Sequence, residues 1–312
     1  MKLNEIRTFV AVAEAQSVQE AGNRLGLTQS AVSRLIQRLE AELGVALFDR
    51  QTKPLALTRD GEQALAHARR VLQATDDLSD AFAAVARPRG LLRLGVAHVL
   101  TTLTAHQPLD ALRAAFPDLT VRLHSDWSTP LMEQVRTGTL DGAVVLLHEG
   151  QAPPEDLAAT CVGREPVSII APPGRGVPKI PPTIQDMNAL GWVLQPDGCR
   201  YRASLTDLLA RHGLPLNIAV EAFDQSLLVS LVARGVGFGL APLRLIAPLT
   251  RATPVDTLNL PDFDLTVAVW LIRARFTGRI GPVFDLLEGS LRGDPTLRAP
   301  APVLPILHSA AE

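Results

Sequence analysis

Hydrophobic positions in the first part of the chain recur at helical spacing between explicit start and stop signals. Apolar residues step by three and four from Leu3 to Ala13. Ser17, with Glu20 three positions later, forms a capping box for a second helix that ends at Gly26. Thr28 caps a third helix that ends at Gly44. We expect its buried stripe to comprise Val32, Leu35, Ile36, Leu39 and Leu43.

The opposite face of this third helix is uniformly polar. It consists of Gln29, Ser30, Ser33, Arg34, Gln37 and Arg38. Most polar helix faces are simply solvated, but Gln and Arg also match the edges of adenine and guanine in the DNA major groove. A short helix, a glycine turn and a second helix with such a face predict a helix-turn-helix. Two short strands, Leu47–Arg50 and Lys53–Thr58, follow as a wing with a basic tip.

Thr58 caps a long helix that is expected to reach Ala86. Apolar and small residues form a heptad seam along it, at Ala64, Ala68, Val71, Thr75, Leu78, Phe82 and Val85. Such a seam needs a partner, and the sequence favours a second copy of the chain over packing on its own domain. Two-fold symmetry would then set two recognition helices about one DNA turn, or a multiple, apart.

The segment Arg87–Gly90 breaks the helical pattern, and short apolar strands then alternate with amphipathic helices as far as Leu291. This alternation is typical of a parallel α/β sheet. The predicted fold is therefore an α/β multi-domain chain with an N-terminal winged helix-turn-helix, a long dimerisation helix and a C-terminal domain of two α/β subdomains. The expected boundaries are 1–58 for the winged domain, 59–87 for the linker helix, 88–90 for a hinge, 91–160 with 269–293 for subdomain 1, 161–268 for subdomain 2, and 294–312 for a disordered tail.

Composition limits the function classes. The 312 residues carry a net charge of −2 from 30 Lys and Arg against 32 Asp and Glu, which excludes a polybasic tail protein. No run of 18 apolar residues exists, and charged residues interrupt the N-terminal apolar pattern, so we expect neither a membrane span nor a secretory signal but a cytoplasmic protein. Cys161 and Cys199 cannot form a disulfide framework, and no spacing suggests a zinc site, so no metal or cofactor is expected.

The N-terminal pattern resembles the LysR-type transcriptional regulators. The matching residues run without a gap through Phe9, Ala13, Ala21, Leu25, Leu27–Ser33, Ile36, Leu39–Glu40, Leu43–Gly44, Leu47–Phe48, Arg50, Leu57–Thr58 and Gly61. Two positions depart from the family: Ser30 stands where Pro is frequent, and Gly22 where Ala is usual. The resemblance implies a winged helix-turn-helix and an effector domain similar to type II periplasmic binding proteins.

If the first domain is a helix-turn-helix, side-chain chemistry predicts which of its residues contact DNA. Gln29, Ser33 and Arg34 are expected at base edges. Thr28, Ser30, Gln37 and Arg38 would divide between bases and phosphates, and Arg50 and Lys53 would hold the backbone or minor groove. The expected partners are an interrupted inverted repeat in promoter DNA, a second copy in a dimer or tetramer, a small-molecule effector, and RNA polymerase if the protein is an activator.

Ligands of open α/β sheets bind at the carboxyl ends of strands and between subdomains. The expected effector-binding residues are His98, Val99, Leu100, Thr101, Thr102, Trp127, Ser128, Leu146, Leu147, His148, Cys199, Arg200, Tyr201 and Phe223. The resemblance places Arg200 where relatives reach the effector from the second subdomain. Apolar residues replace the Ser and Thr of many relatives in the first loop, which favours an aromatic or otherwise partly apolar carboxylate.

Three alternatives stay open. Peroxide-sensing relatives use a reactive cysteine in this subdomain, so Cys199 also allows a redox role, although only Cys161 could partner it. A regulator without a small ligand, constitutive or modulated by a protein, would show a closed apolar pocket. An enzyme with a fused helical module is disfavoured, because we find no nucleophile elbow, P-loop, dinucleotide fingerprint or paired metal ligands.

Overall fold

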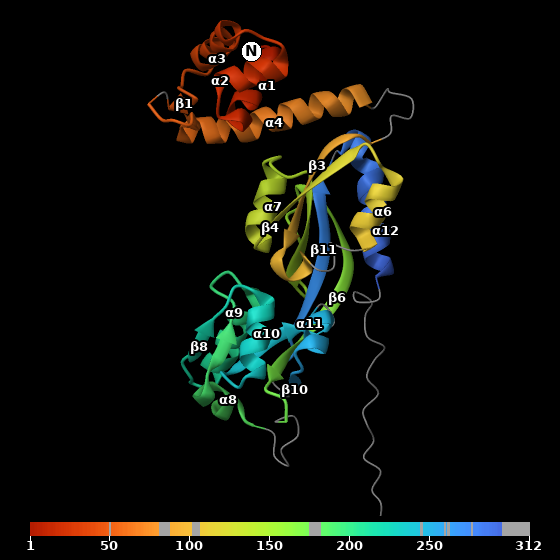
Figure 1. The fold of residues 1–312 in the computed structure, drawn as a ribbon. Coiled ribbons are helices and arrows are strands. Elements are labelled where there is room, and N and C mark those ends of the chain that lie inside the picture. The colour runs from red at the N-terminus through yellow and green to blue at the C-terminus, as the bar shows by residue number, and fades with distance from the viewer. Residues whose placement is uncertain are drawn as a thin grey trace, which may run out of the picture.

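The computed structural model describes residues 1–49, 51–80, 88–101, 107–174, 182–243, 246–258, 260, 263–275 and 277–294. Three parts follow one another along the chain: a small helical domain, a long helix and an elongated α/β domain (Figure 1). Most of the expected tail, residues 295–312, lies outside the described residues.

The N-terminal domain has the winged helix-turn-helix order. Helices α1 (Leu3–Ala15), α2 (Val18–Leu25) and α3 (Gln29–Leu43) are followed by strands β1 (Phe48–Asp49) and β2 (Ala56–Leu57). The two strands pair antiparallel and form the wing. The predicted helices and wing strands are therefore present.

Local capping explains where these helices begin and end. Ser17 Oγ accepts a hydrogen bond from the Glu20 amide at 3.3 Å, and Thr28 Oγ1 accepts from the Ala31 amide at 3.2 Å. Gly26 and Gly44 close α2 and α3 with φ of 65° and 74°, a left-handed conformation that favours glycine. These signals are short-range, which is why the sequence pattern located the helices correctly.

The core of the N-terminal domain is formed by Ile6, Phe9, Val12, Ala21, Val32, Ile36, Leu39, Leu47, Phe48 and Ala68. The predicted stripe of α3 holds for Val32, Ile36 and Leu39, which are buried. It is wrong for Leu43, whose side chain is 43% exposed. Leu43 lies in the last turn of α3, where no element of its own domain covers it.

Helix α4 (Arg59–Asp80) packs its first half on the N-terminal domain. Ala68 is only 8% exposed there, so the beginning of the predicted seam is covered within its own chain. Farther along, Val71 and Leu78 are 41% and 65% exposed. The seam prediction therefore needs correction at Ala68, while Phe82 and Val85 lie outside the described residues.

The C-terminal domain alternates strands and helices. Its elements are β3 (Gly90–Ala97), η1 (His98–Leu100), α6 (Gln107–Ala115), β4 (Leu119–Asp126), α7 (Ser128–Arg136), β5 (Gly142–His148), β6 (Leu157–Ala171), α8 (Ile184–Leu190), β7 (Trp192–Leu194), α9 (Arg200–Arg211), β8 (Ile218–Glu221), α10 (Gln225–Ala233), β9 (Phe238–Pro242), α11 (Ala247–Ala252), β10 (Asp256–Leu258), β11 (Thr266–Ala274), η2 (Gly278–Ile280) and α12 (Gly281–Gly293).

A mixed sheet joins the two subdomains. Its strand order is β4-β3-β5-β11-β6-β9-β7-β8, with β10 paired to β6. Strands β3, β4 and β5 pair in parallel in subdomain 1, as do β7, β8 and β9 in subdomain 2. The long strands β6 and β11 run antiparallel to each other, and they also pair antiparallel with β9 and β5. The expectation of a parallel sheet therefore holds only for β3, β4 and β5 and for β7, β8 and β9.

The crossover between the subdomains lies within β6. This strand pairs with β11 as far as Pro166 and with β9 from Val167 onward. The chain returns at Thr266, the first residue of β11. The pairing thus changes at residues 166–167 and 265–266, a few residues from the boundaries expected at 161 and 268, because a continuous strand gives no compositional break at the crossover.

Candidate DNA-binding surface and effector cleft

The polar face of α3 is open to solvent. Thr28, Gln29, Ser30, Arg34, Gln37 and Arg38 are exposed, and Ser33 is half-buried. The Arg34 Nε donates a hydrogen bond to the Ser30 carbonyl of the same helix at 3.3 Å, and Thr28 Oγ1 lies 3.1 Å from Ser30 Oγ. Apart from Ser33, these side chains are therefore available to a partner without unpacking the domain.

The wing lies directly after this surface. Phe48 pairs with Leu57 and Asp49 with Ala56, and Lys53 at the tip is exposed. Arg50, the other predicted wing contact, lies outside the described residues. The structure thus presents α3 and Lys53 as exposed groups of one small domain, in the arrangement that the helix-turn-helix prediction requires.

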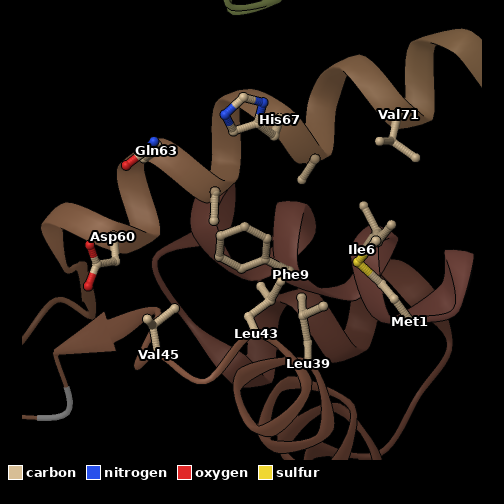
Figure 2. Close-up of a pocket in the computed structure, with 12 residues that line it drawn as sticks. Met1, Ile6, Phe9, Leu39, Leu43, Val45, Asp60, Gln63, His67 and Val71 are labelled. Carbon is tan, nitrogen blue, oxygen red and sulfur yellow. The ribbon is translucent and has the colours of Figure 1, made fainter.

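An apolar groove of about 420 Å³ opens between the N-terminal domain and α4. Figure 2 shows α4 contributing Gln63, His67 and Val71 on one side, with Met1, Ile6, Leu39 and Leu43 on the other. Ala64 and Ala68 also line it. Three exposed apolar side chains of the domain, Met1, Leu43 and Val45, therefore lie beside Val71 in the exposed part of the seam.

A second, much smaller cavity of about 40 Å³ lies between the two subdomains. Subdomain 1 contributes Ala97, His98, Val99, Trp127, Ser128, Thr129 and Leu146, and subdomain 2 contributes Gln195, Gly198, Cys199 and Tyr201. A volume near 40 Å³ holds only a few water molecules. We call this cavity, together with the ring of Phe223, the effector cleft.

Three aromatic rings close the effector cleft from opposite sides. The His98 ring lies 4.3 Å from the ring of Phe223 and 5.3 Å from that of Trp127, each in an edge-to-face arrangement. The Trp127 and Phe223 rings are 5.4 Å apart. Such pairs attract one another through edge-to-face geometry. Contacts of His98 and Trp127 with Phe223 therefore join subdomain 1 to subdomain 2 across the cleft.

A network of hydrogen bonds from Cys199 through Gln195 holds the backbone of Phe223. The Cys199 thiol donates to Gln195 Oε1 at 3.2 Å, and Gln195 Nε2 donates to the Phe223 carbonyl at 3.3 Å. The same Nε2 lies 3.3 Å from Gln225 Oε1. Gln195 was not among the predicted effector-binding residues. Its place directly after the apolar strand β7 could have identified it, because a buried side-chain amide at such a strand end requires hydrogen-bond partners.

The subdomain 2 side of the cleft is formed by the start of α9. Cys199 is the N-cap of this helix, and the backbone amides of Tyr201 and Arg202 are directed at its sulfur atom. The Tyr201 hydroxyl is buried and has no hydrogen-bond partner. Burial raises the pKa of Tyr201 well above its ordinary value, which keeps it a neutral donor. Among the described residues the lining includes no Asp, Glu, Lys or Arg, and the negative charge of the nearby buried Glu165 also raises the pKa of Tyr201.

The subdomain 1 side carries a histidine that is held neutral. Burial lowers the pKa of His98 from 6.5, and the charge of His124 lowers it further, whereas Asp126 opposes both. His98 Nδ1 lies 2.8 Å from Ser125 Oγ. Asp126 accepts a hydrogen bond from the Trp127 amide at the start of α7, so this helix end is already partly compensated by a carboxylate.

Several predicted effector-binding residues lie elsewhere. Leu100 and Leu147 are buried in the core, and Thr101 is exposed without lining the cavity. His148 lines a separate surface hollow with Ser204 and Asp207. Successive residues of a strand point to opposite faces, so Leu146 enters the cleft whereas Leu147 cannot. Thr102 and the side chain of Arg200 lie outside the described residues.

Similarity to known proteins covers both parts of the chain. The family described as "LysR substrate binding domain" matches residues 86–287, and "Bacterial regulatory helix-turn-helix protein, lysR family" matches residues 3–62. The chain belongs to the LysR family. It is a DNA-binding transcriptional regulator with a domain for a small-molecule effector, as the sequence predicted.

Individual relatives agree with this membership. A "probable hydrogen peroxide-inducible genes activator" of Mycobacterium xenopi is 36% identical over 170 residues, which are 54% of this chain and 88% of the relative. The fold resembles a full-length OxyR variant of Pseudomonas aeruginosa, with a TM-score of 0.77, 21% identity and coverage of 96% and 100%. It also resembles full-length LysG of Corynebacterium glutamicum with bound effector Arg, with a TM-score of 0.63, 19% identity and coverage of 93% and 98%.

Two further findings concern the described residues alone. None of their helices is long and apolar enough to cross a membrane. Within the same residues, no group of three or more His, Cys, Asp or Glu side chains is arranged to hold a metal ion.

Proposed function

We propose that this LysR-family regulator reads promoter DNA with α3, as a dimer, and senses a small carboxylate-bearing effector in the cleft. The exposed polar face of α3 carries the proposal for DNA, because Arg34, Gln29 and Ser33 present base-reading chemistry on a rigid helix. Lys53 would contact the backbone beside it. The site of action is then the cytoplasm, and an activator would also contact RNA polymerase.

The apolar groove supports self-association. Val71 and Leu78 expose apolar side chains on α4, and Leu43 and Val45 extend the same patch onto the N-terminal domain. A second copy of α4 offers a complementary surface. Two copies related by a two-fold axis would each bury the exposed seam of the other. Leu78→Glu should therefore convert the dimer to a monomer in sedimentation analysis, while Asp294→Lys on the far end of the chain should not.

The effector cleft supports a small anion. The Tyr201 hydroxyl supplies a buried donor without a partner on one side, and none of the described lining side chains is a carboxylate that would repel the ligand. Because the cavity is only about 40 Å³, a ligand larger than a carboxylate group must displace a lining side chain such as Trp127. The arginine effector of LysG belongs to that protein; here the lining favours a ligand with an apolar body beside its carboxylate.

The closed aromatic contact across the cleft favours a second candidate. A cleft that stays shut would suit a regulator that is constitutive or modulated by a protein. In either case we propose that the chain is not an enzyme, since the matched family and the named relatives are regulators.

The test is a mobility shift on the DNA upstream of its own gene, at fixed salt with random competitor. Footprinted binding to an interrupted inverted repeat would support the DNA proposal, and binding no better than to random duplex would refute it. A panel of aliphatic and aromatic carboxylates is then screened by thermal shift and by its effect on this binding. Stabilisation that Tyr201→Phe abolishes supports the effector proposal; a panel without any effect supports the ligand-independent candidate.

A further inference from the structure

One arginine of α4 contacts both the DNA-binding domain and the effector domain. The Arg69 guanidinium pairs with Glu14 Oε1 of α1 at 3.3 Å and donates to Thr139 Oγ1 of subdomain 1 at 3.4 Å. Its side chain is only 17% exposed. This residue therefore holds three elements that lie far apart in the sequence: α1, α4 and the loop of residues 137–140.

The loop of residues 137–140, which we call the docking loop, rests directly on α4. At Gly138, where φ is 75°, an added Cβ would lie 3.6 Å from Arg70 Cγ and 3.7 Å from Arg69 Cβ. The Arg69 Nε is buried there without a hydrogen-bond partner. A buried unpaired donor opposes the contact that buries it, so the free energy that favours docking is reduced and the contact is easier to break.

The docking loop directly follows the C-terminal end of α7, and the N-terminal end of α7 is a wall of the effector cleft. Trp127 and Ser128 begin the helix in the cleft, and Ser128 Oγ accepts a hydrogen bond from the Leu146 amide at 3.0 Å. Nine residues of α-helix span about 13 Å. In Figure 1, α7 lies beneath α4 on that side of the effector domain.

Hydrogen bonds make α7 and the docking loop one unit. The Thr137 amide donates to the Glu133 carbonyl, and the Thr139 and Leu140 amides both donate to the Gln134 carbonyl. The Gln134 side chain reaches back to Asp126 Oδ2 at 3.5 Å, beside the start of the helix. A shift of Trp127 would therefore move the docking loop as well, and shifts of one or two ångströms are typical of helices that transmit a signal.

We infer that α7 couples the state of the effector cleft to the DNA-binding domain through the contact between Thr139 and Arg69. The inference rests on the proposed function, since it assigns a route between the proposed DNA surface and the proposed effector site. Coupling between two sites is reciprocal. DNA bound to α3 must then change the surroundings of Trp127, so the route can be tested before the effector is known.

The experiment titrates the full-length protein with operator duplex and follows tryptophan emission together with the anisotropy of labelled DNA. The chain has three tryptophans, so Trp127→Phe identifies the contribution of Trp127. Thr139→Val removes the effector-domain side of the contact and leaves Glu14 paired with Arg69. Arg136→Met is the matched control, because Arg136 lies at the same helix end but pairs with Glu133 of its own helix.

We expect DNA to shift the emission of the wild type and of Arg136→Met, and this shift to vanish in Trp127→Phe. Thr139→Val should lose the shift while its DNA affinity stays within twofold. Arg69→Met, with circular dichroism as the check on folding, should behave in the same way. A full shift in Thr139→Val, or wild-type binding without any shift, would overturn the coupling but leave DNA binding intact. Absence of operator binding in the anisotropy would instead overturn the proposed function and this inference with it.

Discussion

Replacing Arg34 with Ala separates base reading from a merely solvated helix face. Arg34 is exposed and donates a hydrogen bond to the Ser30 carbonyl of its own helix, so we expect Arg34→Ala to change the free energy of unfolding by no more than about 0.5 kcal/mol. Loss of a bidentate contact to guanine costs about 1–3 kcal/mol of binding. At about 1.4 kcal/mol per tenfold, operator affinity should fall by about 5- to 140-fold.

The assay compares the operator with a random duplex of equal length at several salt concentrations. Arg34→Ala should weaken the operator complex far more than the random complex, and selection from randomised DNA should show a relaxed preference at one base pair. Arg24→Ala is the control, because Arg24 is as exposed but lies on α2 and pairs with Glu20. An equal loss on both duplexes, with a salt slope reduced by about one, would show a phosphate contact and refute base reading by Arg34.

Three further predictions follow from the described contacts. Gly61→Ala should lower the free energy of unfolding by about 1–3 kcal/mol in chemical denaturation, since an added Cβ would lie 2.0 Å from the Leu47 carbonyl oxygen; unchanged stability would show that the start of α4 adapts. Acidification below pH 6.5, the ordinary pKa of histidine, should open the cleft, because burial lowers the pKa of His98 in the closed state and the open state then binds the proton more tightly. A shift of Trp127 emission that persists in His98→Gln would contradict this, and His124→Gln serves as the control for the neighbouring histidine. Micromolar hydrogen peroxide should leave operator affinity within twofold and Cys199 unoxidised by mass spectrometry, since burial raises the pKa of Cys199 and thus lowers its thiolate fraction; rapid oxidation of Cys199 would favour a peroxide sensor.

The exposed polar face of α3, our proposed DNA-binding surface, was largely predictable because its determinants are local. Ser17, Thr28 and Gly44 set the helix ends through bonds within a few residues, and the spacing of Val32, Ile36 and Leu39 fixes which face of α3 is buried. The remaining face must then be exposed, whatever the rest of the chain does. Leu43 broke the pattern because its cover is not provided by its own domain.

The effector cleft was predictable only in outline. The rule that ligands bind at strand ends selected His98, Trp127 and Tyr201, which line the cavity, but it treats all residues of a loop alike. It therefore included His148, which the alternation of β5 directs to another surface. It also missed Gln195, whose partners come from different elements and are brought together only by the fold.

The closed cleft and the docked α4 together limit how far ligand binding can shift the conformational equilibrium of this chain. A ligand shifts an equilibrium only by its differential affinity for the two states. Here opening must break the contacts of Phe223 with His98 and Trp127, so the effector has to offset that loss before it gains anything. The same helix that loses an aromatic contact at its N-cap, Trp127, leads directly into the docking loop, where Thr139 contacts Arg69. Opening the cleft and signalling to the DNA-binding domain would then both require movement of α7. The effector concentration to which the regulator responds would depend on the strength of the aromatic contact.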